Sequence, residues 1–100
     1  MSGRNVRTVY RWSDSDAIAY DASAQSAAVS AHIHQVRIVT TGAAWVAIGT
    51  NPTAVADTDD NHFLAAGVPE IITVSPGQKL AFIKATGAAA GVACVTELTG

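Results

Sequence analysis

The chain has 100 residues, of which 49% are hydrophobic and 14% are charged, and its formal net charge is −2. This length suits one domain, and the excess of apolar over charged residues excludes a disordered chain. The six Lys and Arg residues form no extended basic patch, so we expect no nucleic acid partner. A weakly charged surface loses little hydration on burial, which favours lasting contact with another protein.

The first predicted strand, residues 6–12, alternates between two faces. Tyr10 and Trp12 lie on one face, and Arg7 and Arg11 lie on the other, as expected for a strand with one covered face. Aromatic side chains grouped beside arginine are typical of a protein contact. The candidate protein-interface residues are therefore Arg7, Tyr10, Arg11 and Trp12. An ordinary solvated strand is the alternative interpretation of these charges.

The rest of the N-terminal segment consists of small and polar residues. Residues 13–16 are turn formers that predict the end of the first strand, and residues 17–20 predict a second, short strand. Residues 21–28 have no large apolar side chains at helical spacing, so we expect a loop. We divide the single domain into residues 1–28, an N-terminal arm or the first strands, and residues 29–100, a β-sandwich.

Two longer strands are predicted in the middle of the chain. Residues 29–41 are rich in strand-forming residues, and a strand would place His32 and His34 on one face. Residues 44–48 predict the next strand, joined to the first by a hairpin connection at 41–43.

Short strands separated by turns continue to the C-terminus. The expected strands are residues 62–65, 71–74, 79–85 and 92–98. Pro76 and Gly77 predict a tight turn, because Pro presets one backbone angle and Gly permits a positive φ. Seven or eight strands without a helix predict an all-β fold, a single small β-sandwich or jelly-roll-like domain with an extended N-terminal segment.

Three notable side chains lie inside apolar runs of these strands. Trp45 and Phe82 are assigned to the core on that ground. Cys94 is the only cysteine, and its apolar neighbours predict a buried, unreactive thiol. With Trp45 and Phe82 assigned to the core, Tyr10 and Trp12 are the best candidates for an exposed aromatic patch.

Metal ligation is the first chemical function to consider. His32 and His34 on one strand face could bind a metal with a third ligand from His62 or from the acidic loop residues Asp57, Asp59 and Asp60. Their spacing matches no compact metal motif. Counted from Asp57, an EF-hand loop would need Gly at the position of His62 and Glu at that of Val68. We therefore expect no metal and interpret the histidines as half-exposed strand residues.

Catalytic motifs are also missing from the sequence. No Gly-x-Ser-x-Gly elbow and no glycine-rich phosphate loop occurs. No His lies near Cys94 in sequence, and the two glutamates, Glu70 and Glu97, lie in strand-like contexts. We expect a protein that is not an enzyme and uses no cofactor.

The order of several sequence blocks resembles a group of small tailed-phage virion proteins encoded with the head genes. These blocks are VRIV at 36–39, WVAIGTNPTA at 45–54, FLAAGVPE at 63–70, VSPGQKLA at 74–81 and VTEL at 95–98. The resemblance covers about two thirds of the chain, and the order of the blocks is more specific than any one of them. It implies a small β-sandwich or jelly-roll protein that decorates and cements a capsid.

The resemblance also implies partners and a location. The expected partners are the major capsid protein and further copies of the chain, in a homo-oligomer such as a trimer at a symmetry axis. No apolar stretch is long enough to cross a bilayer and the first twelve residues contain no signal-like apolar run. We expect synthesis in the host cytoplasm, a place on the capsid surface of the virion and no membrane partner. The alternative function is a carbohydrate-binding or adhesion module on the virion surface, and a metal-dependent β-barrel enzyme is a more remote one.

Overall fold

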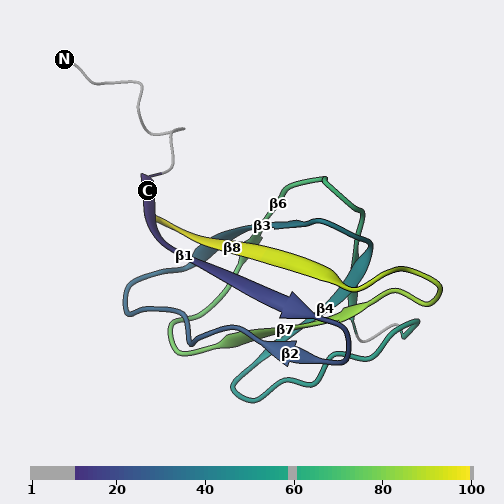
Figure 1. Cartoon of the computed structure of the whole chain (residues 1–100). Helices are drawn as coiled ribbons and strands as arrows, with labels where there is room; N and C mark the ends of the chain where they lie inside the picture. The colour runs from purple at the N-terminus through teal and green to yellow at the C-terminus, as the bar shows by residue number, and fades with distance from the viewer. Residues whose placement is uncertain (1–10, 59–60, 100) are drawn as a thin grey trace.

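The computed structural model describes residues 11–58 and 61–99, with the backbone alone for residues 11–14 and 99. This part of the chain contains eight β-strands and no helix, so the predicted all-β class is confirmed (Figure 1). The strands are β1 (Arg11–Tyr20), β2 (Ala24–Gln25), β3 (Gln35–Thr40), β4 (Ala44–Gly49), β5 (His62–Leu64), β6 (Glu70–Thr73), β7 (Lys79–Lys84) and β8 (Gly91–Thr99). Among the described residues, therefore, no helix is available to span a membrane.

The strands form two four-stranded antiparallel sheets. The strand order is β1-β8-β3-β6 in the first sheet and β2-β7-β4-β5 in the second. Of the connections between these eight strands, only the one from β4 to β5 joins strands of the same sheet. The chain therefore passes from one sheet to the other at nearly every turn.

The predicted hairpin at residues 41–43 is wrong for this reason. A hairpin joins two neighbouring strands of one sheet, but β3 and β4 belong to different sheets. The Tyr20 hydroxyl fixes the crossing, because it donates to the carbonyl oxygen of Gly42 at 2.7 Å and accepts from the Gly42 amide at 3.3 Å.

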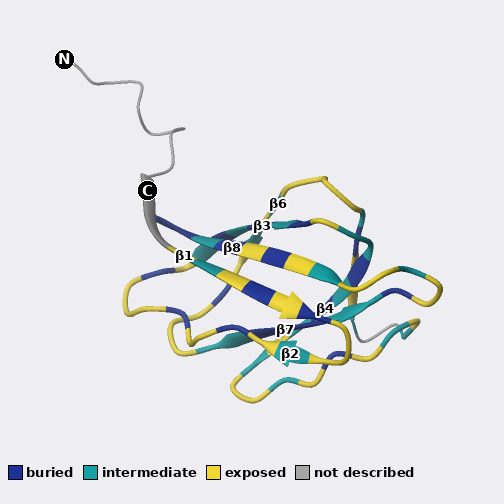
Figure 2. Ribbon diagram, viewed as in Figure 1, coloured by how far each residue is buried: buried dark blue, intermediate teal, exposed yellow. Residues whose placement is uncertain are grey.

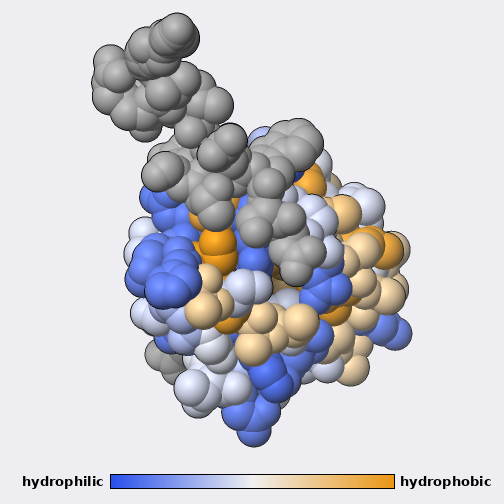
Figure 3. All heavy atoms as spheres, turned by 90° about the vertical axis from the view of Figure 1, so that its left-hand side faces the viewer, coloured by the Kyte–Doolittle hydropathy of each residue, from blue (hydrophilic) through white to orange (hydrophobic). Residues whose placement is uncertain are grey.

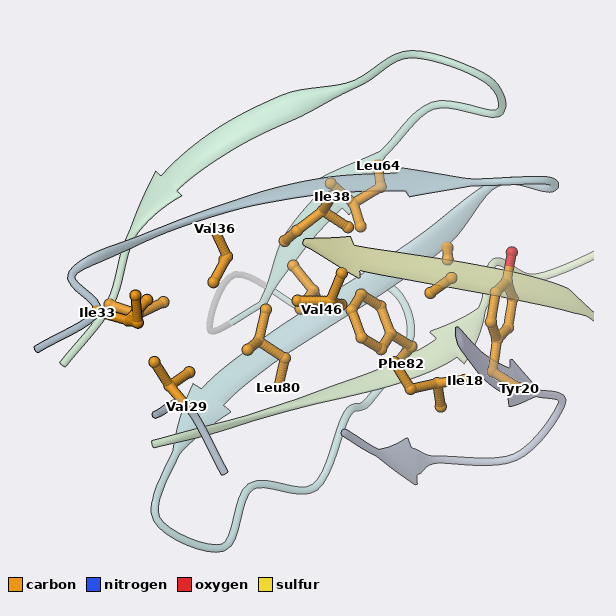
Figure 4. Packing of buried hydrophobic residues seen from close by; sticks show 14 residues of the cluster. Ile18, Tyr20, Val29, Ile33, Val36, Ile38, Val46, Leu64, Leu80 and Phe82 are labelled. Atoms are coloured by element: carbon orange, nitrogen blue, oxygen red, sulfur yellow. The ribbon is translucent and has the colours of Figure 1, made fainter. Parts of the chain in front are cut away.

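One buried hydrophobic cluster draws side chains from both sheets. Ile18 and Ile38 come from the first sheet and Val46 and Phe82 from the second (Figure 4). Most strands alternate between buried and more exposed residues, as Figure 2 shows along β1 and β8, whereas β7 buries Leu80, Ala81 and Phe82 in succession. Each large apolar side chain buried here contributes about 1.5–3 kcal/mol to stability. This period of two is why the sequence pattern identified most of the strands.

The N-terminal strands differ from their predicted bounds. The turn predicted at residues 13–16 is wrong, because β1 continues through it as a bulge between Trp12 and Ser15. Residues 17–20 belong to the same strand, and the predicted loop at 21–28 contains β2. Of the segment interpreted as an arm or first strands, residues 1–10 lie outside the described residues, and β1 and β2 pair with β8 and β7.

The long strand predicted at residues 29–41 begins only at Gln35. His32 has a φ of 68°, which no strand residue adopts, so the chain turns there. Val29 and Ile33 on either side of the turn both reach the core. The prediction that His32 and His34 share a strand face is therefore wrong.

The later strands agree with their predicted positions to within two residues at each end. The structure places β4, β5, β6, β7 and β8 where apolar runs were predicted. The tight turn between β6 and β7 is confirmed, and Gly77 takes the positive φ, 87°, that the turn requires.

Candidate interaction site

The outward side of the first sheet is a regular surface to which β1, β8, β3 and β6 all contribute. The strand register sets which side chains are neighbours across this surface. Ala17 lies opposite Cys94, which lies opposite Val39, and Ala19 lies opposite Val92. We name this surface the outer β8 face. It consists of Ser15, Ala17, Ala19, Gln35, Arg37, Val39, Ile71, Thr73, Val92, Cys94, Thr96 and Leu98, of which Leu98 is buried.

The outer β8 face carries almost no charge. Arg37 is its one charged side chain in the part of the chain that the structure describes. Ile71 is 47% exposed on the edge strand β6, and Val92 is also exposed. A broad surface of small and apolar side chains is suited to contact with another protein, because few charges have to be desolvated.

Cys94 lies in the middle of the outer β8 face as a free, exposed thiol. Its predicted burial is wrong. On β8 the neighbours Ala93 and Val95 occupy the core side, so alternation turns Cys94 outward. Because Cys94 has apolar neighbours on both sides, the sequence pattern did not show which residues of this run face the core.

The four predicted interface residues are only partly within the described chain. Arg7 and Tyr10 lie outside the described residues. Arg11 and Trp12 begin β1, where their backbones lie opposite Thr99 and Leu98 of β8. The structure thus places the start of β1 at the end of the sheet that also contains the C-terminal part of β8.

An aromatic pair lies on the outward side of the second sheet. The rings of Trp45 and Phe63 meet edge to face, with centroids 5.3 Å apart. The assignment of Trp45 to the core is wrong, because Ala44 and Val46 take the core side of β4. Phe82 is fully buried, as predicted. Sequence reasoning missed the pair because only the register of β4 and β5 brings these two residues together.

The connection from β4 to β5 covers another part of this second sheet. The Gln25 side-chain amide donates to Asn51 Oδ1 at 2.9 Å and to the Pro52 carbonyl at 2.7 Å. The Ala54 amide donates to Ser23 Oγ at 2.9 Å. These bonds hold the connection against β2, and Ala81, which pairs with Gln25, is fully buried. This side of the second sheet is therefore partly closed by the connection.

The proposed metal ligands do not come together. Among the described residues, no group of three or more His, Cys, Asp or Glu side chains is placed to hold a metal ion. His62 contacts Glu70 at 2.8 Å, and Asp57 accepts a hydrogen bond from Thr86. Asp59 and Asp60 lie outside the described residues.

Comparisons of the chain with known protein families, with curated proteins and with solved structures find no match. The surfaces described above and the sequence blocks between residues 36 and 98 are therefore the basis for a function.

Proposed function

We propose that the protein is a non-enzymatic structural component of a phage virion, which binds the head lattice as a decoration or cement protein. The proposal includes a β-sandwich of jelly-roll type. Two four-stranded antiparallel sheets that share one core, with connections that alternate between them, support this fold. A fold type alone does not determine function. The proposed role therefore depends on the surface chemistry of the outer β8 face.

The outer β8 face is the observation on which the proposal rests. It offers small, nearly uncharged side chains on four adjacent strands, with Arg37 as its one charge among the described residues. A stable contact needs about 800 Å² on each partner, and many copies on one lattice add avidity. The order of sequence blocks shared with small phage virion proteins supports the same role.

The proposed partners are the major capsid protein and further copies of this chain. Closed symmetry is the rule for homo-oligomers, so a trimer at a capsid symmetry axis fits the role. A net charge of −2 supports a protein partner rather than nucleic acid. The proposed location is the capsid surface, after synthesis in the host cytoplasm, without a membrane partner.

Attachment to head particles that lack the protein tests this proposal. The wild-type protein is expected to sediment with the particles and to saturate them. Ala17→Glu places a charge on the outer β8 face, on the edge strand β1 beside Cys94, and its affinity is expected to fall at least tenfold, because burial of an unpaired charge is unfavourable. The matched control is Ser75→Glu in the exposed turn before β7, which should attach like the wild type. Undiminished attachment of Ala17→Glu would contradict the role of this face.

A second candidate function, carbohydrate binding, is favoured by the Trp45–Phe63 pair. Phe63 is 44% exposed, and the two rings lie together on the surface of the second sheet. Sugar rings stack on exposed aromatic faces. Titration with capsular and cell-wall oligosaccharides, followed by tryptophan fluorescence, separates the two functions. A saturable response that is lost in Phe63→Ala, which keeps Trp45 as the reporter, supports the carbohydrate-binding module, and no response supports the capsid role.

A further inference from the structure

A pocket of about 220 Å³ opens at one end of the molecule, where β1 and β8 meet the connection between β2 and β3. This connection forms the left-hand end of the molecule in Figure 1, and that end faces the viewer in Figure 3. Two carboxyl groups, those of Asp16 and Glu97, line the pocket together with the apolar side chains of Val36, Leu80 and Val95. Among the described residues that line it, none is Lys, Arg or His.

Glu97 is an unusual residue for this position, because its side chain is mostly buried, with the residue 8% exposed. Its Oε2 atom accepts a hydrogen bond from the Ser30 amide at 2.8 Å. Its Oε1 atom is buried and has no hydrogen-bond partner among the described residues. A buried carboxylate oxygen without a partner is strongly unfavourable. Glu97 Oε1 therefore lacks the hydrogen-bond donor that would offset the cost of its burial.

Asp16 adds a second carboxyl group to the same pocket. Its Oδ2 atom accepts from the Ala27 amide at 3.0 Å, which orients the carboxyl group. The register of β1 and β8 pairs Asp16 with Val95, so Asp16 and Glu97 lie on adjacent strands near the same end of the sheet. Two acceptors without a basic side chain among the described lining residues favour a positively charged ligand with several N–H donors.

We propose that this pocket binds a guanidinium group, with Glu97 as its main counter-charge and Asp16 as a second acceptor. A guanidinium group offers a planar set of donors that pairs with carboxylates, and it is weakly hydrated, so it tolerates the apolar walls formed by Val36, Leu80 and Val95. A metal ion fits less well, because no group of three or more ligating side chains occurs among the described residues. The proposal does not depend on the virion role.

Titration with methylguanidinium chloride, followed by ¹⁵N NMR of the full chain, tests the pocket. The amides of Ser30 and Ala27 are the reporters, because they donate to Glu97 and Asp16. Both amide signals are expected to shift and to saturate. Tetramethylammonium chloride has the same charge without N–H donors and is expected to cause no saturable shift. A response that does not saturate, or an equal response to tetramethylammonium, would overturn the proposal.

Substitutions identify the carboxyl group responsible. Glu97→Gln keeps the size of the side chain and removes its charge, so methylguanidinium affinity is expected to fall at least tenfold. The matched control, Glu70→Gln, removes a charge from a glutamate that contacts His62 outside the pocket and should leave the affinity unchanged. If Glu97→Gln does not fold, Asp16→Asn at the half-buried second acceptor carries the test, with an expected loss of about threefold or more. Wild-type affinity in a folded Glu97→Gln protein would overturn the proposal.

The source of the natural guanidinium group is a separate question, and the same titration answers it. Arg4 and Arg7 lie in the N-terminal segment of this chain. If these arginines occupy the pocket, in their own copy or a neighbouring one, the double substitution of Arg4→Ala and Arg7→Ala will raise methylguanidinium affinity several-fold. Unchanged affinity in that variant excludes Arg4 and Arg7 as the groups that occupy the pocket.

Discussion

Gly91 is the residue at which the start of β8 passes closest to its neighbours. A Cβ atom at this position would lie 2.6 Å from Thr41 Oγ1 and 2.8 Å from the Tyr20 hydroxyl oxygen. Both groups are engaged, since Thr41 Oγ1 accepts from the Val92 amide at 3.0 Å and Tyr20 bonds to Gly42. A larger residue would therefore disturb the crossing from β3 to β4 as well as β8.

Gly91→Ala is expected to lower the free energy of unfolding by about 1–3 kcal/mol, the usual effect of overpacking. Gly49→Ala is the matched control, because its Cβ would meet only Pro52 Cβ, at 3.9 Å, and its effect should stay within about 0.5 kcal/mol. Urea denaturation of both variants measures the difference. Equal stability of Gly91→Ala and the wild type would contradict the close approach.

The two phenylalanines offer a second comparison at the scale of single residues. Phe82 is fully buried, whereas Phe63 is 44% exposed. Phe82→Ala is expected to lower the free energy of unfolding by about 3–5 kcal/mol, enough to bring a small domain close to unfolding. Phe63→Ala should lower it by about 1 kcal/mol or less, since the residue is exposed and its ring packs edge to face with Trp45 outside the core. Similar losses from both substitutions, measured by denaturant titration, would contradict the assigned core.

Trp45 and Cys94 explain why the sequence predicted strands better than it predicted surfaces. Both residues lie in runs with apolar neighbours on each side, so the period of two does not show which face is inward. The structure resolves this only through pairing with strands that are distant in sequence. Gly77 is the opposite case, because its turn depends on local backbone geometry and was predicted correctly.

At the scale of the elements, the connection between β4 and β5 is held by side chains of the β2 region. Ser23 Oγ accepts from the Ala54 amide at 2.9 Å, and Gln25 bonds to Asn51 and Pro52. The sequence predicted a polar loop here but not its attachment to β2. That attachment depends on contacts across about thirty residues of chain.

Ser23→Ala removes the acceptor of the Ala54 amide, and a hydrogen bond of this kind is worth about 1 kcal/mol. Hydrogen exchange at Ala54 is therefore expected to accelerate about fivefold. Ser75→Ala, in an exposed turn after β6, is the matched control and should leave this rate unchanged. Exchange at Ala54 that is as slow in Ser23→Ala as in the wild type would show that the connection is held by other contacts.

At the scale of the whole molecule, the sheet order is the feature that local sequence patterns left undetermined. β1 pairs with β8 from the opposite end of the chain, and β3 pairs with both β8 and β6. These pairings create the outer β8 face and also bring Asp16 and Glu97 to one pocket. The period of two predicted most of the strands, but the two candidate sites exist only because of long-range pairing.

Self-association is the prediction that belongs to this scale. If the protein works as an oligomeric cement protein, light scattering of the purified wild type will give the mass of a small homo-oligomer such as a trimer, with or without a chelator. A mass that falls on chelation would contradict this account and support metal binding. A monomer at all concentrations would contradict the proposed self-association.

The most direct test of the central proposal is the alkylation of Cys94, whose exposed thiol lies in the middle of the outer β8 face. In the free protein, N-ethylmaleimide should modify Cys94 readily, and attachment to head particles should slow the reaction at least tenfold. A control with Cys94→Ser and Ser75→Cys moves the thiol to the exposed turn, where attachment should leave the rate unchanged. Equal alkylation of Cys94 in the free and the attached protein would show that the outer β8 face does not bind the capsid.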